Sequence, residues 1–327
     1  MGGEPLRPNS VGEVLMNSSS ERFQFASAPD SWGVLDYPGP SWNQSFEKML
    51  DEMVEAGYTG TELGPFGFFP TAPEVLKPQL ERRQLKLLGS FVPVVLSDPA
   101  SARVAVDQIR KVGDLLSTLK APFLVLADAQ SRERDRISGR VPADGSASLT
   151  TAQWKNVAKV VEEAARVASE FGLDLVFHPH VATYVETPDE CERFFDVTAK
   201  TGIGLCLDTG HAVYGGADAT AEAEKYRSIL RLVHLKDCDD KVLTEARRKH
   251  LTFDQAVEEK VFTIIGNGAI DFPAFFRVLE KNNYSGWMVV EQDVKFGATV
   301  IPPAQSIAAS LRYLRGVVRE LAGTTTT

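Results

Sequence analysis

The sequence has few cysteines and no long apolar run. Its 327 residues include 3 cysteines, Cys191, Cys206 and Cys238, which form no CxxC pair. An odd number of scattered cysteines favours reduced thiols, so we expect a cytoplasmic protein without a disulfide framework. The run VPVVL at 92–96 is typical of the longest apolar stretches, and a bilayer-spanning helix needs roughly 18 such residues. We therefore exclude a membrane span.

Basic residues are also in short supply. The chain has 35 lysines and arginines against 44 aspartates and glutamates, a net charge of −9. Binding to a phosphate backbone needs a basic surface, so we exclude a nucleic acid partner. The first residues contain no continuous apolar segment of the kind found in secretory signals. We expect a flexible extension at 1–22 and a frayed tail at 323–327.

What the chain does contain is a series of eight short β-rich segments separated by amphipathic stretches. Several segments are continuously apolar, as parallel strands covered by helices are. The predicted strands are 23–28, 59–64, 85–92, 122–128, 173–180, 203–208, 230–237 and 287–293. Apolar residues recur at helical spacing in the stretches at 45–57, 101–121, 150–172 and 273–284, and a closing helix is predicted at 303–322.

Eight β-then-α units predict an α/β fold, a single-domain (β/α)8 TIM barrel over residues 23–322. A doubly wound sheet is the alternative, but its first strand is usually followed by a glycine-rich phosphate loop. The segment FASAPDSWG at 25–33 has no GxGxxG pattern. Two connections are long, at 131–148 after the fourth strand and at 238–271 after the seventh. Both follow the C-terminal end of a strand, so we expect them over the active-site face.

Four of the five histidines fall at predicted strand ends. His178 and His180 end the fifth strand, His211 follows the sixth, and His234 lies in the seventh, whereas His250 lies in a charged stretch. In a barrel, polar residues at the C-terminal ends of strands indicate chemistry rather than stability. A lone buried histidine is often only a core residue, but four at neighbouring strand ends favour a site.

Imidazole and carboxylate groups from adjacent strands can bind one divalent ion. One such residue from each of the last four strands gives the candidate ligands His178, Asp208, His234 and Glu291. A mixed nitrogen and oxygen set suits Mn²⁺, Co²⁺, Fe²⁺ or Zn²⁺ better than Ca²⁺. His178 and His180 are two residues apart on an extended strand and face the same side, so either is a candidate ligand.

Several motifs resemble the xylose isomerase-like barrels, the sugar phosphate isomerase/epimerase superfamily, over about residues 23–320. They are EAGYTGTELG (55–64), LDTGH (207–211), VHLKD (233–237) and the segment 266–293, and FHPHVAT (177–183) is most similar to the inosose dehydratase branch. The resemblance implies a divalent metal, commonly Mn²⁺ or Co²⁺, with Asp208, His234 and Glu291 at ligand positions.

The fifth strand departs from the family pattern, because many members have a glutamate where this chain has His178. The substitution removes one negative charge from the ligand set and makes the site a stronger Lewis acid. It also leaves fewer carboxylates for epimerisation by two bases on opposite faces of one carbon. The resemblance therefore favours elimination over epimerisation.

The polar strand ends suit proton abstraction next to a ketone. An unactivated α-proton is too weakly acidic for a side-chain base, so the carbonyl must be polarised and the enediolate stabilised. His180 and His211 are the candidate bases, because an imidazole titrates close to the working pH. Lys236 is a candidate to stabilise the enolate or, as an acid, to help expel the β-hydroxyl. A surface lysine on a loop is the alternative.

Three further residues are candidate substrate contacts. The resemblance favours Glu62, at the end of the second strand, as a partner of ring hydroxyls, with a solvated or capping carboxylate as the alternative. Sugar-like rings often lie against aromatic faces, which makes Phe66 in PFGFFP (65–70) and Trp32 after the first strand candidate pocket walls. Both aromatic residues fit equally well as a plug under the rim or an oligomer contact.

We expect a metal-dependent lyase that dehydrates a keto-inositol or keto-sugar, with Mn²⁺ as the metal and Co²⁺, Mg²⁺ or Zn²⁺ as alternatives. Two other functions stay open: a keto-sugar isomerase or epimerase, and a β-eliminating deglycosidase of 3-keto-glycosides. The presence of candidate metal ligands together with candidate bases argues against a barrel without catalytic activity. The net negative charge of the chain argues against a nuclease. The partner is a small keto-sugar or keto-cyclitol, with room for a homo-oligomer or a second subunit over the barrel mouth.

Overall fold

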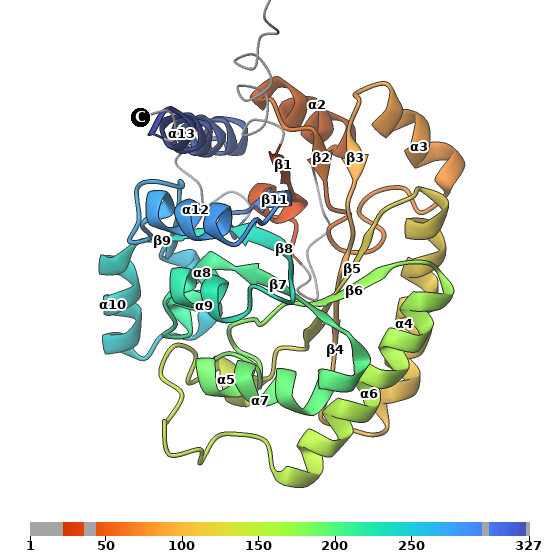
Figure 1. Ribbon diagram of the computed structural model, residues 1–327, viewed down its shortest axis with the longest axis vertical. Helices are drawn as coiled ribbons and strands as arrows, with labels where there is room; N and C mark the ends of the chain where they lie inside the picture. The colour runs from red at the N-terminus through yellow and green to blue at the C-terminus, as the bar shows by residue number, and fades with distance from the viewer. Residues whose placement is uncertain (1–21, 36–43, 296–300, 325–327) are drawn as a thin grey trace, which may run out of the picture.

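The computed structural model describes residues 22–35, 44–295 and 301–324, in which a parallel sheet curls into a barrel (Figure 1). The strand order is β3-β2-β1-β11-β8-β7-β6-β5-β4. The strands are β1 (Phe23–Ser27), β2 (Gly60–Thr61), β3 (Lys86–Leu87), β4 (Phe91–Val94), β5 (Phe123–Asp128), β6 (Asp174–Phe177), β7 (Gly204–Asp208), β8 (Leu230–Leu235) and β11 (Gly286–Val290). The predicted TIM barrel is confirmed. Of the predicted extension at 1–22, all but Arg22 lies outside the described residues.

The predicted third strand, 85–92, is in fact two strands that close the barrel. β3 pairs with β2 and β4 pairs with β5, and the residues between them contact both neighbours. The amide of Leu88 donates to the carbonyl of Thr61, and the amide of Phe123 donates to the carbonyl of Leu88, each at 2.9 Å. A Cβ on Gly89 would lie 2.8 Å from the carbonyl oxygen of Phe123, so only glycine allows this close approach.

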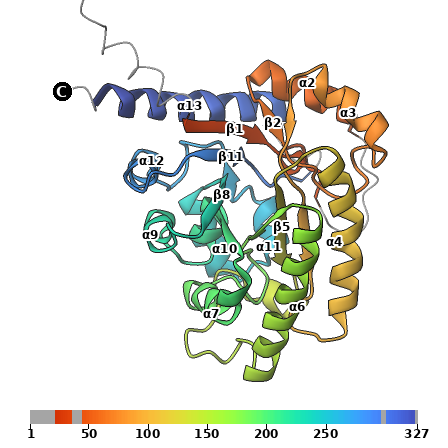
Figure 2. The same cartoon turned by 45° about the vertical axis from the view of Figure 1, so that its right-hand side comes forward.

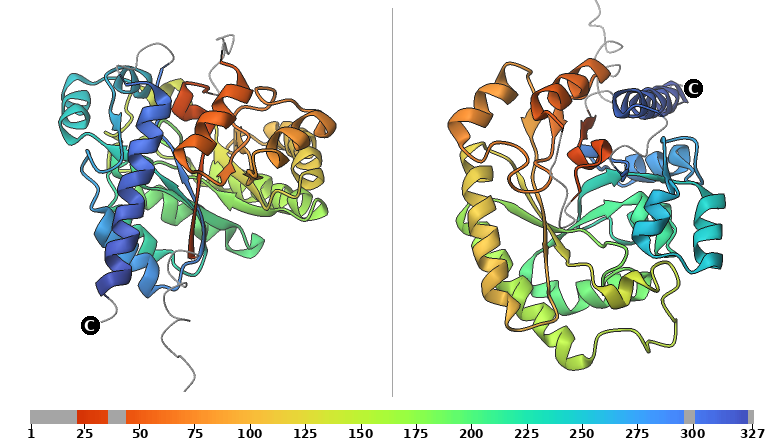
Figure 3. Two further views of the ribbon diagram at one scale, coloured as in Figure 1. Left: turned by 90° about the horizontal axis from the view of Figure 1, so that it is seen from above. Right: turned by 180° about the vertical axis from the view of Figure 1, so that it is seen from behind.

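Helices cover the outside of the barrel (Figures 2 and 3). They include α2 (Phe46–Ala56), α3 (Pro73–Glu81), α4 (Ser101–Thr118), α6 (Thr151–Glu170), α7 (Pro188–Thr198), α8 (Thr209–Tyr214), α9 (Ala219–Lys225), α12 (Phe272–Lys281) and α13 (Pro303–Thr324). α4 and α6 lie side by side, and α13 packs against α2 and α12. α13 extends two residues into the predicted tail, and 325–327 lie outside the described residues. None of the described helices is long and apolar enough to cross a bilayer.

The barrel interior is a small apolar cluster of its own. Neighbouring strands contribute short or branched side chains to it, among them Ala26, Val125, Val176, Cys206, Leu232 and Val289. Successive side chains on a strand alternate between the two faces, so the residues two positions further along point to the same interior side. On the last four strands these are the predicted metal ligands.

The two long connections carry structure and contact each other. The first contains α5 (Arg132–Asp135), and the second contains β9 (Asp237–Cys238), α10 (Asp240–Lys249), α11 (Phe253–Glu258) and β10 (Phe262–Thr263). The amide of Phe253 donates to Oδ1 of Asp135 at 2.8 Å. Nη1 of Arg140 donates to the carbonyl of Leu251 at 3.2 Å. The second connection has a separate apolar core, in which Phe253, Phe262 and Leu243 are buried.

Candidate active site

A cavity of about 530 Å³ lies at the C-terminal ends of the strands and is lined by both long connections. A volume of this size is typical of a small-molecule site. Its lining includes most of the predicted site residues: Glu62, His178, His180, His211, His234, Lys236 and Glu291. Asp208 is buried directly beside them, with its Oδ2 3.6 Å from Nε2 of His178.

The four predicted metal ligands meet at one point. One donor atom from each of His178, Asp208, His234 and Glu291 lies within 4.8 Å of the others, and all four residues are buried. Strand register explains the meeting, because Asp208 pairs directly with His234 across β7 and β8. His178 directly follows β6 and Glu291 directly follows β11. Parallel strands bring their C-terminal ends to the same edge, where these side chains converge.

The donor atoms fit a divalent cation. Within the described part of the chain, Oδ2 of Asp208 and Nδ1 of His234 are buried and have no hydrogen-bond partner. Nδ1 of His234 lies only 3.0 Å from Oε1 of Glu291, so a ring nitrogen and a carboxylate oxygen face a common position. Buried polar atoms without partners are costly unless a ligand satisfies them. Two imidazoles and two carboxylates are a donor set that transition metals accept.

Lys236 supplies a fixed positive charge beside this position. Its Nζ lies 2.8 Å from Oδ1 of Asp293, 3.2 Å from Oε2 of Glu291 and 3.4 Å from Oδ2 of Asp208. Burial on its own lowers the pKa of Lys236, but the three carboxylates outweigh it and raise the pKa well above the usual value. The side chain therefore stays an ammonium ion.

The rings of His180 and His211 lie against each other, with centroids 3.9 Å apart and planes tilted by 38°. Burial, with the nearby His178 and Lys236, lowers the pKa of His180 to about 3. Burial and the neighbouring His180 lower the pKa of His211 well below its usual value. Both rings are therefore neutral near pH 7. Nδ1 of His180 lies 2.6 Å from the carbonyl of Val181, and Nε2 of His211 lies 3.2 Å from Nζ of Lys236.

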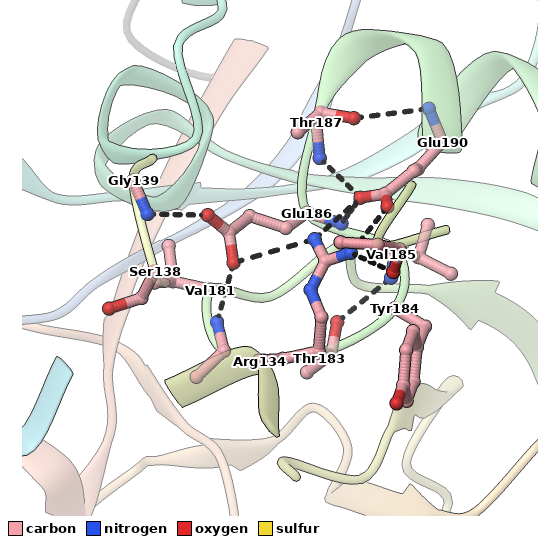
Figure 4. Close-up of polar contacts among 12 residues, drawn as sticks. Arg134, Ser138, Gly139, Val181, Thr183, Tyr184, Val185, Glu186, Thr187 and Glu190 are labelled. Atoms are coloured by element: carbon pink, nitrogen blue, oxygen red, sulfur yellow. Dashed lines mark hydrogen bonds and ion pairs between the residues drawn. The ribbon is translucent and has the colours of Figure 1, made fainter. Parts of the chain in front are cut away.

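A buried ionic network lies beside the loop that carries His180 (Figure 4). Arg134, which is 1% exposed, donates through Nη1 and Nη2 to the two carboxylate oxygens of Glu190 at 2.6 and 2.9 Å. A second carboxylate, that of Glu186, has an oxygen 3.9 Å from Nη2 of Arg134. Burial raises the pKa of Glu186 to about 7. One guanidinium thus balances two carboxylates in the protein interior.

The network holds the 180–187 loop in place. Glu186 accepts the amide of Gly139 at 2.6 Å and the amide of Ala182 at 2.8 Å, which ties the loop to the first long connection. Ala182 has a left-handed backbone with φ of 66°, which is unfavourable for alanine and needs such support. Ser131 donates its amide to the carbonyl of Ala182 at 3.0 Å. His180 lies two residues before this point, so the network fixes the backbone that directly follows it.

The acidic residues of the cavity that were not predicted include Asp293, Asp128 and Asp30. Asp293 contacts Lys236, and it could have been found because it follows Glu291 by two residues and faces the same side. Asp128 ends β5 and accepts the amides of Leu96 and Tyr184; burial raises its pKa to about 6.

The third, Asp30, lies in the 3₁₀ turn Pro29–Trp32. Both of its carboxylate oxygens are buried without a hydrogen-bond partner among the described residues. Burial, then the charge of Glu291, raises the pKa of Asp30 well above the usual value. No pattern in the sequence distinguishes this aspartate from an ordinary turn residue.

Two predicted substrate contacts lie away from the described cavity. Trp32 is 6% exposed and donates its Nε1 to Oε2 of Glu52 on α2 at 2.7 Å. The ring of Phe66 lies under Nζ of Lys111 on α4, with 4.7 Å between Nζ and the ring centroid. Among the described residues that line the cavity, neither aromatic side chain is present. Both point outward to the helix layer, because the turns after β1 and β2 carry them past the rim.

Asp237, the last residue of VHLKD, holds a loop in place and is not part of the candidate metal site. The carboxylate of Asp237 accepts the amides of Gly266, Gly268 and Ile270 at 2.9, 3.0 and 3.2 Å. A Cβ on Gly268 would lie 2.3 Å from Oδ1 of Asp237, so glycine is required there. The segment GNGAID (266–271) is therefore a turn that is held by Asp237 and followed by α12.

Comparison with known proteins agrees with this architecture. The family model described as "Xylose isomerase-like TIM barrel" matches residues 50–317. Inosose dehydratase of Geobacillus kaustophilus is 32% identical over 280 residues, which cover 85% of this chain and 90% of that protein. Inosose dehydratase of Clostridium perfringens is 33% identical over 269 residues, which cover 81% of this chain and 88% of that protein.

Solved structures share the fold at lower sequence identity. The IOLI protein with a bound zinc atom superposes with a TM-score of 0.68 at 16% identity, covering 91% of this chain and 98% of that one. The 3-keto-D-glucoside 4-epimerase YcjR of E. coli gives a TM-score of 0.66 at 16% identity, covering 90% of this chain and 99% of that one. On the family match and the identity to these relatives, the chain belongs to the xylose isomerase-like TIM barrel family.

Proposed function

We propose that the protein is a metal-dependent carbon–oxygen lyase that removes water from a keto-inositol or a related keto-sugar. The observation that carries the proposal is the convergence of His178, Asp208, His234 and Glu291 beside a neutral His180 in one cavity. The relatives named inosose dehydratase, which align over most of the chain, support the same reaction class. The reaction removes a proton next to the ketone and expels the β-hydroxyl as water.

The four converging side chains are the proposed ligands of a divalent metal. When bound, such a cation supplies Lewis acidity to a ketone oxygen and an adjacent hydroxyl. We favour Mn²⁺, because the mixed nitrogen and oxygen donors suit it, with Co²⁺, Mg²⁺ and Zn²⁺ as alternatives. The zinc atom in the IOLI structure supports a divalent metal in this fold.

His180 is the better candidate for the base. Its Nδ1 faces the carbonyl of Val181, which can only accept, so Nδ1 carries the hydrogen and Nε2 keeps a lone pair for the substrate proton. In His211 the situation is reversed, because Nε2 lies in hydrogen-bond contact with the ammonium of Lys236 and accepts from it. His211 and Lys236 then act together as a fixed positive group that stabilises the developing enolate.

Replacing His180 by asparagine should lower kcat by about 10² to 10⁴-fold, because a positioned general base contributes that much. The variant should keep its bound metal, measured by elemental analysis of the dialysed protein. His250→Asn is the matched control: His250 is exposed and left-handed at φ 55°, a conformation that asparagine tolerates. If His180→Asn keeps wild-type turnover while His211→Asn loses it, the base is His211.

The reaction type can be read directly by NMR in D₂O. Metal-loaded protein incubated with a keto-inositol should convert it, with loss of one water, to a hydroxy-enone, which tautomerises to a saturated diketone. Deuterium exchange with inversion and no loss of water would instead identify the epimerase alternative. A 3-keto-glycoside in the same panel tests the deglycosidase, whose signature is a released aglycone.

Two further expectations stay proposals. We propose a reducing compartment, the cytoplasm, because Cys191, Cys206 and Cys238 are free and buried. We also propose that a second subunit or a second copy of the chain covers the barrel mouth. Size-exclusion chromatography with light scattering measures the oligomeric state directly.

A further inference from the structure

Glu62 contacts a proposed metal ligand rather than projecting freely into the cavity. Its Oε1 lies 3.1 Å from Nε2 of His234, and the two residues are 2% and 1% exposed. Glu62 follows β2 and His234 lies in β8, and two strands, β1 and β11, separate these in the sheet. The pair therefore meets across the inside of the barrel.

The contact with Glu62 gives the two ring nitrogens of His234 different roles. A carboxylate only accepts hydrogen bonds, so Nε2 must carry the hydrogen that it donates to Glu62. When a cation is held by the four converging side chains, Nδ1 is the ring atom left to offer it a lone pair, because Nε2 is engaged by Glu62. It is the buried atom that lacks a hydrogen-bond partner and lies 3.0 Å from Oε1 of Glu291.

We propose that Glu62 is a positioning residue, whose carboxylate orients His234 and keeps its Nδ1 available to the metal. The inference rests on the proposed function, because it requires a cation at the four converging side chains. A carboxylate on the far nitrogen of a ligating histidine fixes the ring and increases its basicity, and its loss typically costs 10–100-fold in metal affinity. In this proposal Glu62 acts through His234, and not through the hydroxyls of the substrate as the family resemblance implied.

The backbone around Glu62 is suited to this role. The amide of Glu62 donates to the carbonyl of Ser27 at 3.2 Å, which ties the residue to β1. The hydroxyl of Thr61 donates to the carbonyl of Glu62 at 2.9 Å. With both backbone groups held, the side chain has a fixed starting point from which to reach His234.

Two substitutions of Glu62 separate the effect of its hydrogen bond on the orientation of His234 from the effect of its negative charge. Glu62→Gln keeps an oxygen that can accept the Nε2 hydrogen but removes the negative charge, whereas Glu62→Leu removes both. Glu52→Gln is the matched control, since Glu52 accepts a hydrogen bond from Trp32 outside the cavity. Metal-free protein is titrated with Mn²⁺ and Zn²⁺ by calorimetry against a competing chelator. Histidine ¹⁵N NMR of the same samples reports which nitrogen of His234 carries the hydrogen.

We expect Mn²⁺ affinity to fall by about 10–100-fold in Glu62→Leu and by less in Glu62→Gln. In the metal-free samples, the tautomer of His234 with its hydrogen on Nε2 should persist in Glu62→Gln and be lost in Glu62→Leu. The control should match the wild type. If Glu62→Leu does not fold, the inference is tested by Glu62→Gln alone, through its smaller loss of Mn²⁺ affinity and the NMR signal of His234.

The possible failures are distinguishable. Wild-type affinity in both variants, with a raised KM for a keto-inositol, would overturn the inference and make Glu62 a substrate contact. A wild-type protein that binds neither Mn²⁺ nor Zn²⁺ would overturn the proposed function itself.

Discussion

Replacing Glu291 by glutamine should empty the proposed metal site and abolish turnover. The side chain is 8% exposed, and its two oxygens face Nδ1 of His234 and Nζ of Lys236 at 3.0 and 3.2 Å. Glutamine keeps the shape but removes the charge that a divalent cation needs. Lewis-acid stabilisation is worth several kcal/mol, so kcat should fall by roughly 10³-fold or more.

The measurement is metal content after dialysis, together with kcat for a keto-inositol. Glu245→Gln is the control, because Glu245 is half-exposed on α10 and pairs with neighbouring basic side chains of that helix. It should keep both metal and activity. Full metal occupancy and full turnover in Glu291→Gln would show that the ligand assignment is wrong.

Replacing Arg134 by methionine should destabilise the fold more than any surface change. Arg134 is 1% exposed, and its removal leaves the carboxylates of Glu186 and Glu190 buried without their cation. Breaking such a buried pair typically costs about 3–5 kcal/mol. We expect Tm to fall by on the order of 10 °C, measured by circular dichroism and checked by urea unfolding.

The chain offers a matched control in Arg166→Met. Arg166 also pairs with two glutamates, Glu163 and Glu170, but on the exposed side of α6. Such surface pairs are screened by water, so Tm should not change measurably. Equal shifts in the two variants would mean that the buried network does not support the loop that carries His180.

The fold and the convergence of the four candidate ligands could be predicted because both follow from strand periodicity. Eight β-then-α units define the barrel, and side chains at i and i+2 on a strand share a face, which brought His178, Asp208, His234 and Glu291 to one mouth. The third strand was predicted as one segment, because its split at Gly89 depends on pairing with two different neighbours. The local sequence does not indicate which strands pair with this segment on its two sides.

Side-chain direction beyond the strand ends could not be predicted. Trp32 and Phe66 follow strands just as His211 does, but the turns that carry them face the helix layer. Glu62 was expected in the cavity, and the structure places it there, yet its partner His234 is 172 residues away in sequence. Lys236 and Asp293 are likewise far apart in sequence, and their ion pair is visible only in the folded structure. Contacts across the barrel depend on tertiary packing, which cannot be predicted from the spacing of residues along the chain.

The contact between the two long connections has a consequence for how this barrel can change its substrate. They come from different halves of the chain, yet Asp135 and Phe253, one from each, both line the cavity and are hydrogen-bonded to each other. Exchanging either segment alone would remove the matched partner of that bond. Substrate range in this branch should therefore evolve, or be engineered, by exchanging the two segments as a matched set.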